Sequence, residues 1–258
     1  MGQEPGISSG DGLPVPADCT NLSGPLFPLY RRLQNFSGRI VRDPLVATII
    51  GQKQFPHDQP IWAERGNLAH LFVIERGFAY KFQILPNGQR HIADFFGPGA
   101  ICNWSRLNAF DEQDDLMFKS QTTVTHLDVK KLSALLDTQP GIASVFKRHE
   151  LARALRSTQR TRAFISLNAT EKLLIAILDL LDEYAVSGVI QERVTLPFSQ
   201  QELADLMGVT PVHVSRTFTR LEDDGIIQRE KRTIRLRDPD GIRRLLAYRD
   251  YFRSRSSE

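Results

Sequence analysis

The sequence has little cysteine and no long apolar run. Only Cys19 and Cys102 are cysteines among 258 residues, so one chain cannot supply four thiolates to a zinc ion or an iron–sulfur cluster. The apolar stretch 173–181 is interrupted by Asp179 and is far shorter than the roughly 20 residues of a membrane helix. No basic segment followed by an apolar core opens the chain. We therefore expect a cytoplasmic protein without a secretory signal or a disulfide scaffold.

Neither sign of charge dominates the composition. Lys and Arg number 33 against 30 Asp and Glu, a formal net charge of +3, so any contact with nucleic acid depends on where the basic residues lie. Hydrophobic residues make up 41% and charged residues 24%, values close to the soluble globular average, which excludes collagen-like and wholly disordered chains. At roughly 100 to 200 residues per domain, this length predicts two domains.

The N-terminal half changes from a tail to a β-rich region. Residues 1–24 are rich in Gly, Pro, Ser and Asp and predict a flexible tail. Residues 25–138 predict a β jelly-roll sensor domain that opens with a short helix over 26–36, because short β-rich runs separated by glycines occupy 61–127. The Asn-Gly pair within 86–88 predicts a hairpin with a type I′ turn, which needs two positive φ angles.

After Asp128 the apolar period changes from 2 to 3.6, and residues 139–166 predict one long helix. A narrow apolar seam runs along it, while basic residues, among them Arg153, Arg156 and Arg160, cover most of the remaining surface. Such a helix needs a partner, and we expect the same helix of a second copy in a two-fold dimer. An amphipathic helix packed on the β-domain is the alternative. The predicted dimer seam comprises Ile142, Val145, Phe146, His149, Ala152 and Leu155.

The last third of the chain, residues 167–258, predicts a winged helix-turn-helix. Ser199 and Glu202 have the spacing of a capping box, Gly208 ends the short helix that follows, and Thr210 is a good N-cap for the next one. Residues on either side of Glu230-Lys231-Arg232 alternate as in a β-hairpin. Two short helices joined by a glycine turn, with a basic hairpin behind them, are typical of proteins that insert the second helix into the DNA major groove.

The second of these helices, over 210–224, carries Ser, Thr and Arg side chains outward. We expect Arg216 to read a base, because an Arg fork pairs with O6 and N7 of guanine. Helix starts and the basic hairpin tip favour phosphate contacts. The predicted DNA-contact residues are Ser199, Gln200, Thr210, Pro211, Val212, His213, Ser215, Arg216, Arg220, Lys231 and Arg232.

These residues resemble the Crp-Fnr superfamily of bacterial transcription regulators. The resemblance rests on FSQQELADLMGVTPVHVSRTFTRLEDDGII, residues 198–227, and next on FFGPGAICN, residues 95–103, ahead of a long helix. It implies an α+β fold with an N-terminal β jelly-roll similar to a cyclic-nucleotide-binding domain, a long dimerisation helix and a C-terminal winged helix-turn-helix. It also implies a homodimer that binds double-stranded DNA at a palindromic operator and works with RNA polymerase, and not an enzyme.

The resemblance also places a candidate effector pocket, in which this chain departs from the family pattern. Family members that bind a cyclic nucleotide carry a Gly-Glu-Leu element and a later Arg-Ser or Arg-Ala pair, whereas here no acidic residue follows Gly99 and the basic position is Lys119. Lys lacks the planar fork that grips a phosphate, so a cyclic nucleotide is not favoured. Another effector and control by abundance alone both stay open, and we predict no cofactor and no metal. The candidate pocket residues are Cys102, Asn103, Trp104, Lys119 and Ser120.

Two other functions compete with this one. A cupin-like metal-dependent enzyme would need closely spaced His ligands, and the six His residues show no such spacing. A ligand-binding adaptor without a DNA function would have no need of Arg216, Arg220, Lys231 and Arg232 on the exposed side of the helix and hairpin, although a run of charge is often only a solvated face.

Overall fold

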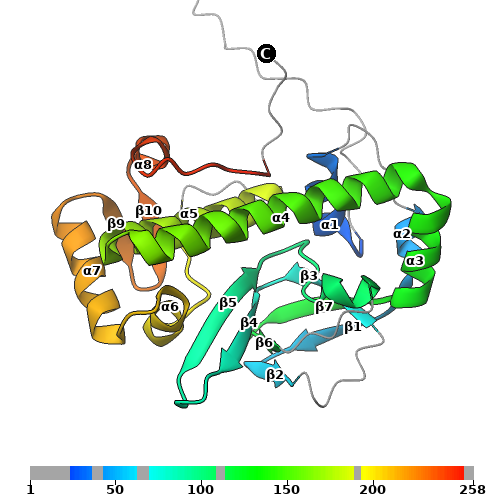
Figure 1. The fold of residues 1–258 in the computed structure, drawn as a ribbon, viewed down its shortest axis with the longest axis horizontal. Coiled ribbons are helices and arrows are strands. Elements are labelled where there is room, and N and C mark those ends of the chain that lie inside the picture. The colour runs from blue at the N-terminus through cyan, green and yellow to red at the C-terminus, as the bar shows by residue number, and fades with distance from the viewer. Residues whose placement is uncertain (1–23, 37–42, 63–69, 109–113, 189–192, 253–258) are drawn as a thin grey trace, which may run out of the picture.

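The computed structural model of the chain describes residues 24–36, 43–62, 70–108, 114–188 and 193–252. The predicted tail over 1–24, apart from its last residue, lies outside these ranges, and so does Cys19. Within them, no helix is both long enough and apolar enough to cross a membrane. A β-rich part and a helical part lie side by side, and one long helix runs along both of them (Figure 1).

Two antiparallel sheets form the β-rich part, with strand orders β1-β7-β3 and β2-β6-β4-β5. Side chains from both sheets share one core, in which Phe55 stacks on Phe118 with ring centroids 4.6 Å apart and Cys102 is buried. The predicted α+β class with an N-terminal β-domain is confirmed. The strands are β1 Ile49–Phe55, β2 Gln59–Ile61, β3 His70–Arg76, β4 Ala79–Ile84, β5 Arg90–Phe96, β6 Asp115–Phe118 and β7 Thr122–Asp128.

Two of these strands, β1 and β2, begin before the β-rich segment that the sequence predicts over 61–127. β1 lies at the edge of its sheet, and most of its residues are exposed. An exposed edge strand needs no alternation of apolar and polar residues, so the periodicity that identifies a half-buried strand is missing there.

The hairpin between β4 and β5 is confirmed, but its turn is not of type I′. Among the described residues, Gly88 has a positive φ of 80° while Asn87 does not. The amide of Gly88 donates to the carbonyl of Leu85 at 2.8 Å, so Pro86 occupies the second position of the turn. Proline fixes φ near −65° and is favoured at that position of a type I turn, which is incompatible with the predicted mirror-image turn.

In the described residues, four helical segments pack around the β-rich part, and the long helix α4 packs against α1 and α3. Ile142, Val145 and Phe146 of α4 are buried against α1 and the sheet that contains β3 and β7. Trp104 stacks on Phe146 with ring centroids 5.3 Å apart. The four segments are α1 Phe27–Gln34, α2 Asp43–Val46, a 3₁₀ helix Trp104–Asn108 and α3 Val129–Thr138. The long helix α4 spans Pro140–Ser166.

The predicted dimer seam therefore packs inside the protomer. Of its six residues, only Leu155 is exposed, and Ile142, Val145, Phe146, His149 and Ala152 are buried by the chain itself, which is the alternative that the sequence left open. The expectation for the arginines is also wrong. Three of them are buried in ion pairs with carboxylates of β5 and of the next helix, α5 (Ala169–Val186). These arginines are Arg153, Arg156 and Arg160, and the carboxylates are those of Asp94, Asp179 and Glu183.

The helical part contains α5 to α8 and a small three-stranded sheet of order β8-β10-β9. Its apolar core continues into the second sheet of the β-rich part, where Tyr80 and Phe95 meet Phe198 edge to face at 5.9 and 5.4 Å. The elements are α5 Ala169–Val186, β8 Val194–Thr195, α6 Gln200–Met207, α7 Pro211–Asp223, β9 Ile227–Glu230, β10 Thr233–Leu236 and α8 Pro239–Leu245.

After α8 the chain runs back along α4 toward α1 (Figure 1). The backbone N–H and carbonyl of Arg249 pair with the side-chain amide of Gln159 at 3.0 and 3.1 Å. Phe252 is buried beside Ala152 and Val186. The C-terminal segment thus ties the helical part to the long helix, a contact that no pattern in the sequence predicts.

Candidate nucleic-acid interface

Local signals in the sequence build the two helices of the motif. Ser199 and Glu202 form the predicted capping box at the start of α6, with the amide of Ser199 donating to Glu202 Oε2 at 2.8 Å. Gly208 ends α6 with a φ of 67°, a conformation that favours glycine. The hydroxyl of Thr210 accepts from the amide of His213 at 3.2 Å and caps α7, whose first residue is Pro211. All these caps were predicted.

α7 presents one polar face to solvent. Val214, Thr217, Phe218 and Leu221 are buried against the rest of the helical part, so the opposite side of the helix is free of the chain itself. Among the predicted DNA-contact residues, only Pro211 is half-buried, and Ser199, Gln200, Thr210, Val212, His213, Ser215, Arg216, Arg220, Lys231 and Arg232 are exposed.

Arg216 is available for an external partner. No acidic side chain in the described part of the chain lies within ion-pair distance of it. Arg220 Nε lies 3.7 Å from Asp224 Oδ2, and both side chains are mostly exposed, so this pair costs little to break. α7 therefore carries two guanidinium groups that can exchange water for base edges or phosphates.

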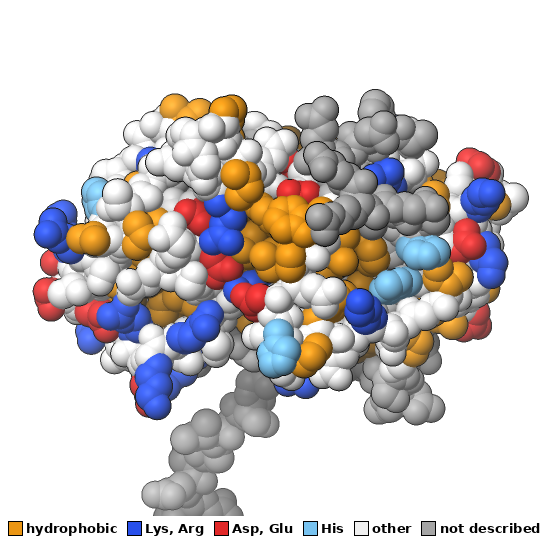
Figure 2. Space-filling model, turned by 90° about the horizontal axis from the view of Figure 1, so that it is seen from below, with side chains coloured by type: hydrophobic (Ala, Val, Ile, Leu, Met, Phe, Trp, Pro, Cys, Tyr) orange, Lys and Arg blue, Asp and Glu red, His pale blue; other side chains and the backbone are white. Residues whose placement is uncertain are grey.

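The predicted hairpin is confirmed as β9 and β10, with β8 added as a third strand. Lys231 lies at its tip with a positive φ of 54°. Arg232 donates through Nε to the carbonyl of Leu196 at 3.1 Å, which orients its stem while the side chain stays exposed. Arg229 of β9 pairs with Glu222 of α7 at 3.0 Å and fixes the hairpin against that helix. Lys and Arg side chains, with acidic ones between them, lie at the end of the molecule that carries α7 (Figure 2).

The predicted effector-pocket residues lie in different surroundings in the described part of the chain. Asn103 is buried, and its side-chain amide is hydrogen-bonded to the backbone. Its Oδ1 accepts from the amide of Phe72 and its Nδ2 donates to the carbonyl of His70, both at 2.9 Å. Trp104 lines a cavity of about 310 Å³ beside α3 and α4. Lys119 and Ser120 line a different cavity, of about 810 Å³, and Cys102 lines neither. The sequence resemblance groups these residues, whereas the structure places Lys119 and Ser120 in a different cavity from Trp104.

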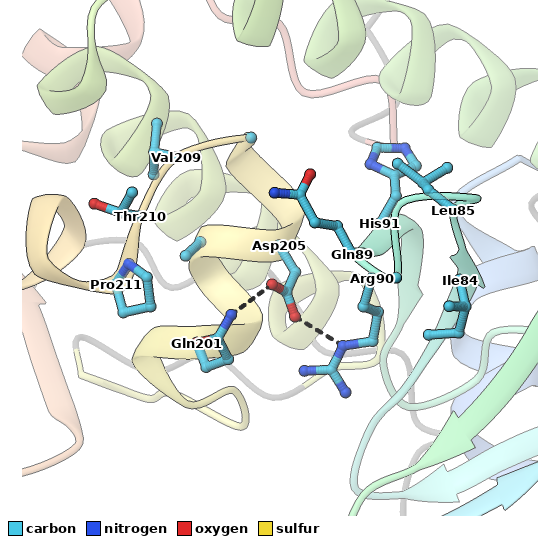
Figure 3. Close-up of a pocket in the computed structure, with 13 residues that line it drawn as sticks. Ile84, Leu85, Gln89, Arg90, His91, Gln201, Asp205, Val209, Thr210 and Pro211 are labelled. Carbon is cyan, nitrogen blue, oxygen red and sulfur yellow. Dashed lines mark hydrogen bonds and ion pairs between the residues drawn. The ribbon is translucent and has the colours of Figure 1, made fainter.

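Lys119 instead contacts the helix-turn-helix. Its Nζ donates to Glu202 Oε1 at 2.8 Å and also pairs with Asp58. Tyr80 donates its hydroxyl to the same oxygen of Glu202 at 2.9 Å, and Arg90 pairs with Asp205 at 2.7 Å (Figure 3). The three contacts with α6 join residues 83, 115 and 122 positions apart, and no local pattern signals them.

A second buried cluster lies where α1, α4, α5 and β5 meet. Burial alone would raise the pKa of Glu183, but the guanidinium groups of Arg156, Arg32 and Arg153 outweigh it and hold that pKa well below its usual range. The amide of Gly97 donates to Glu183 Oε2 at 2.7 Å. A β-carbon at Gly97 would lie 2.8 Å from that carboxylate, so only glycine allows this close approach.

Comparisons with known proteins agree with this architecture. Residues 171–245 match the family model of a Crp-like helix-turn-helix domain. The chain is 21% identical to the transcriptional activator protein FnrA of Stutzerimonas stutzeri over 226 residues, covering 87% of this chain and 89% of that protein. It is 25% identical to the nitrogen fixation regulation protein FixK of Bradyrhizobium diazoefficiens over 197 residues, covering 75% and 81%.

A solved structure shares the fold. The structure of FixK2 from Bradyrhizobium japonicum matches with a TM-score of 0.66 and 18% identity, covering 76% of this chain and 96% of that one. The helix-turn-helix model, the regulators that match over most of their length and the shared three-part fold lead to one identification. The chain carries a Crp-like helix-turn-helix domain over residues 171–245 and is a DNA-binding transcriptional regulator of Crp/Fnr type.

Proposed function

We propose that the chain binds a two-fold symmetric operator as a homodimer, with α7 in the major groove. The observation that carries this proposal is the exposed polar face of α7, which the capped α6 and the turn at Gly208 hold outward. Arg216 reads a base, while Ser199, Thr210 and the hairpin tip at Lys231 hold phosphates, because helix starts and basic tips offer N–H groups and positive charge to the backbone.

The proposed dimer surface is the exposed side of α4, in place of the seam predicted from sequence. Residues 144, 148, 151, 155, 158, 162 and 165 are all exposed, and their alternating spacing of four and three is that of a coiled-coil seam. Leu151, Leu155 and Ile165 supply its apolar surface, with 58%, 42% and 80% of each residue exposed. Family members are typically dimeric, which supports a second copy as the occupant of this side.

Selection of bound duplexes from a randomised DNA pool tests the proposal. The purified protein should enrich a palindrome whose half-sites lie about one helical turn apart, roughly 10 base pairs centre to centre, because a dimer presents two copies of α7. The Arg216→Ala variant should lose enrichment at one position of each half-site, while Arg244→Ala, on the exposed side of α8, should enrich the same palindrome as the unmodified protein. Enrichment of a single, unpaired half-site would contradict the dimer, and no enrichment by any of the three would contradict the operator.

A further inference from the structure

One polar network joins the second sheet of the β-rich part to the first helix of the helix-turn-helix. From the sheet side, Tyr80 of β4 and Lys119, which follows β6, both donate to Glu202 Oε1, at 2.9 and 2.8 Å. Arg90, at the start of β5, donates through Nε to Asp205 Oδ2 at 2.7 Å and through Nη1 to the hydroxyl of Tyr80 at 2.9 Å. We call these five residues, Tyr80, Arg90, Lys119, Glu202 and Asp205, the sheet–helix clasp.

The clasp is largely shielded from water. The side chain of Glu202 is 7% exposed, and those of Lys119 and Asp205 are each 11% exposed. The edge-to-face contacts of Tyr80 with Phe198 lie beside it and exclude solvent from one side. Charge pairs in such surroundings are screened weakly, and removal of one partner leaves the other buried and unpaired. The clasp therefore specifies one orientation of α6 against the sheet more sharply than an apolar contact alone.

Glu202 links this orientation to the DNA-facing end of the motif. Its Oε2 accepts from the amide of Ser199 and completes the helix cap, while its Oε1 accepts from the two sheet residues. One carboxylate thus fixes the position of the start of α6 relative to the sheet. Ser199 and Gln200 are exposed at this end of the helix. Because the short turn at Gly208 joins α6 to α7, the position of α7 follows from that of α6.

The clasp holds α6 without covering the polar face of α7. A cavity of about 720 Å³ lies between the β4–β5 hairpin and the start of α7 (Figure 3). Arg90 reaches Asp205 across one side of this cavity, whereas Thr210 and Pro211 lie on its other side. Val212 and Arg216 remain exposed in the clasped arrangement, so it leaves the proposed base-reading side chains open.

We propose that Tyr80, Arg90 and Lys119 are positioning residues for DNA binding: through Glu202 and Asp205 they set where the two α7 helices of a dimer stand. Because the five residues contact one another directly, the clasp fixes the separation of the two helices. This inference rests on the proposed function, since a separation has meaning only for a dimer on a two-fold operator.

The test measures preference for half-site spacing. Operators are made with the selected spacing and with one or two base pairs added or removed, and a duplex with a single half-site is included. The unmodified protein should bind the selected spacing at least tenfold more tightly than its neighbours. Lys119→Met and Arg90→Asp should lower that preference severalfold and leave single half-site affinity unchanged, because α7 itself is untouched.

Rescue variants separate positioning from general damage to the fold. Lys119→Arg keeps the positive charge and should retain the spacing preference, and adding Asp205→Arg to Arg90→Asp should restore part of it by reversing the pair. Lys130→Met, an equivalent change at an exposed site of α3, is the matched control and should behave as the unmodified protein.

Two outcomes overturn the inference. Clasp variants that are folded and keep the full spacing preference would show that the clasp does not position α7. Variants that bind the operator more tightly would show that the clasped arrangement restrains DNA binding. Failure of the proposed function looks different, because the unmodified protein itself would then have no preferred spacing.

Discussion

Arg156 of α4 and Glu183 of α5 form an ion pair that is closed off from solvent, with side chains 1% and 0% exposed. Arg32 of α1 pairs with the other oxygen of the same carboxylate and is also fully buried. One glutamate therefore balances positive charge from two helices, α1 and the long helix α4. Removal of its charge leaves guanidinium groups buried without a counter-ion. The resulting loss of folding free energy exceeds the net stabilisation that the ion pair gives relative to an apolar contact.

Glu183→Gln should lower the free energy of unfolding by about 3–5 kcal/mol. Denaturant unfolding measures the change, and Glu230→Gln is the control, because Glu230 faces Arg193 at 3.7 Å on an exposed part of the hairpin. The control should lie within about 0.5 kcal/mol of the unmodified protein. A loss below about 1 kcal/mol for Glu183→Gln would show that water or rearranged partners neutralise the cluster.

Arg216→Ala should weaken binding to the selected operator by about 1–3 kcal/mol and relax discrimination at one base pair, because one guanidinium fork is lost. Titration of the cognate operator and of duplexes changed at each position gives both quantities. Equal weakening on every sequence would assign Arg216 to the phosphate backbone instead.

Lys231→Gln combined with Arg232→Gln should weaken binding to all duplexes alike. Binding releases fewer counter-ions from the DNA when a phosphate contact is missing. The slope of log affinity against log salt should therefore become less steep by about 1 for each lost contact. Affinity measured from low to moderate salt reports the slope. An unchanged slope would place the tip of the hairpin away from the DNA.

Leu151→Glu combined with Leu155→Glu should convert the proposed dimer to a monomer at micromolar concentration. Two carboxylates on each exposed seam of α4 would face their copies in a weakly hydrated contact, where like charges repel. Light scattering gives the mass, and Leu245→Glu, at a residue 79% exposed on α8, is the matched control. A double variant with the mass of the unmodified protein would exclude this side of α4 as the dimer surface.

Asp182 should make stability depend on pH. Burial, with the nearby carboxylate of Asp250, raises the pKa of Asp182 from 3.8 to about 7, against the opposing guanidinium of Arg243. Since the folded-state pKa is the higher one, the native state binds this proton more tightly. Its contribution to stability is present in acid and is lost as the pH rises from about 4 to 7.

Comparison with Asp182→Asn isolates this effect. The unfolding free energy of the unmodified protein, relative to the variant, should fall between pH 4 and pH 7 and stay level above pH 7. Urea unfolding at intervals across this range measures the difference. A difference that rises with pH would mean that Arg243 outweighs burial and holds the carboxylate charged.

The parts of the site that the sequence predicts are those whose interactions are local. The caps at Ser199 and Thr210 join residues three positions apart. The end of α6 at Gly208 is predictable because glycine readily adopts the positive φ found there. The buried side of α7 follows from the helical period, as Val214, Phe218 and Leu221 show. Such short-range interactions do not depend on the surrounding tertiary structure, so the sequence pattern is enough to predict them.

The neighbours of the long helix α4 cannot be predicted from the sequence. Its period is visible in the sequence, but a period does not say which neighbour an apolar stripe meets, and Phe146 packs on the chain's own core where a second copy was expected. Arg153 and Arg156 look like surface charges until Asp94 and Glu183 are brought to them from elements far away in the sequence. Lys119 was grouped with Cys102 by resemblance, and the fold turns it toward Glu202.

The order of the three parts, the capped helix-turn-helix and the basic hairpin can all be predicted from the amino-acid sequence, because each depends on residues close together in the chain. The free face of α4, the burial of its arginines and the contacts between the β-rich part and α6 depend on how the elements pack. Those properties depend on contacts between residues about 20 to 150 positions apart, and such contacts exist only once the sheets and helices have packed.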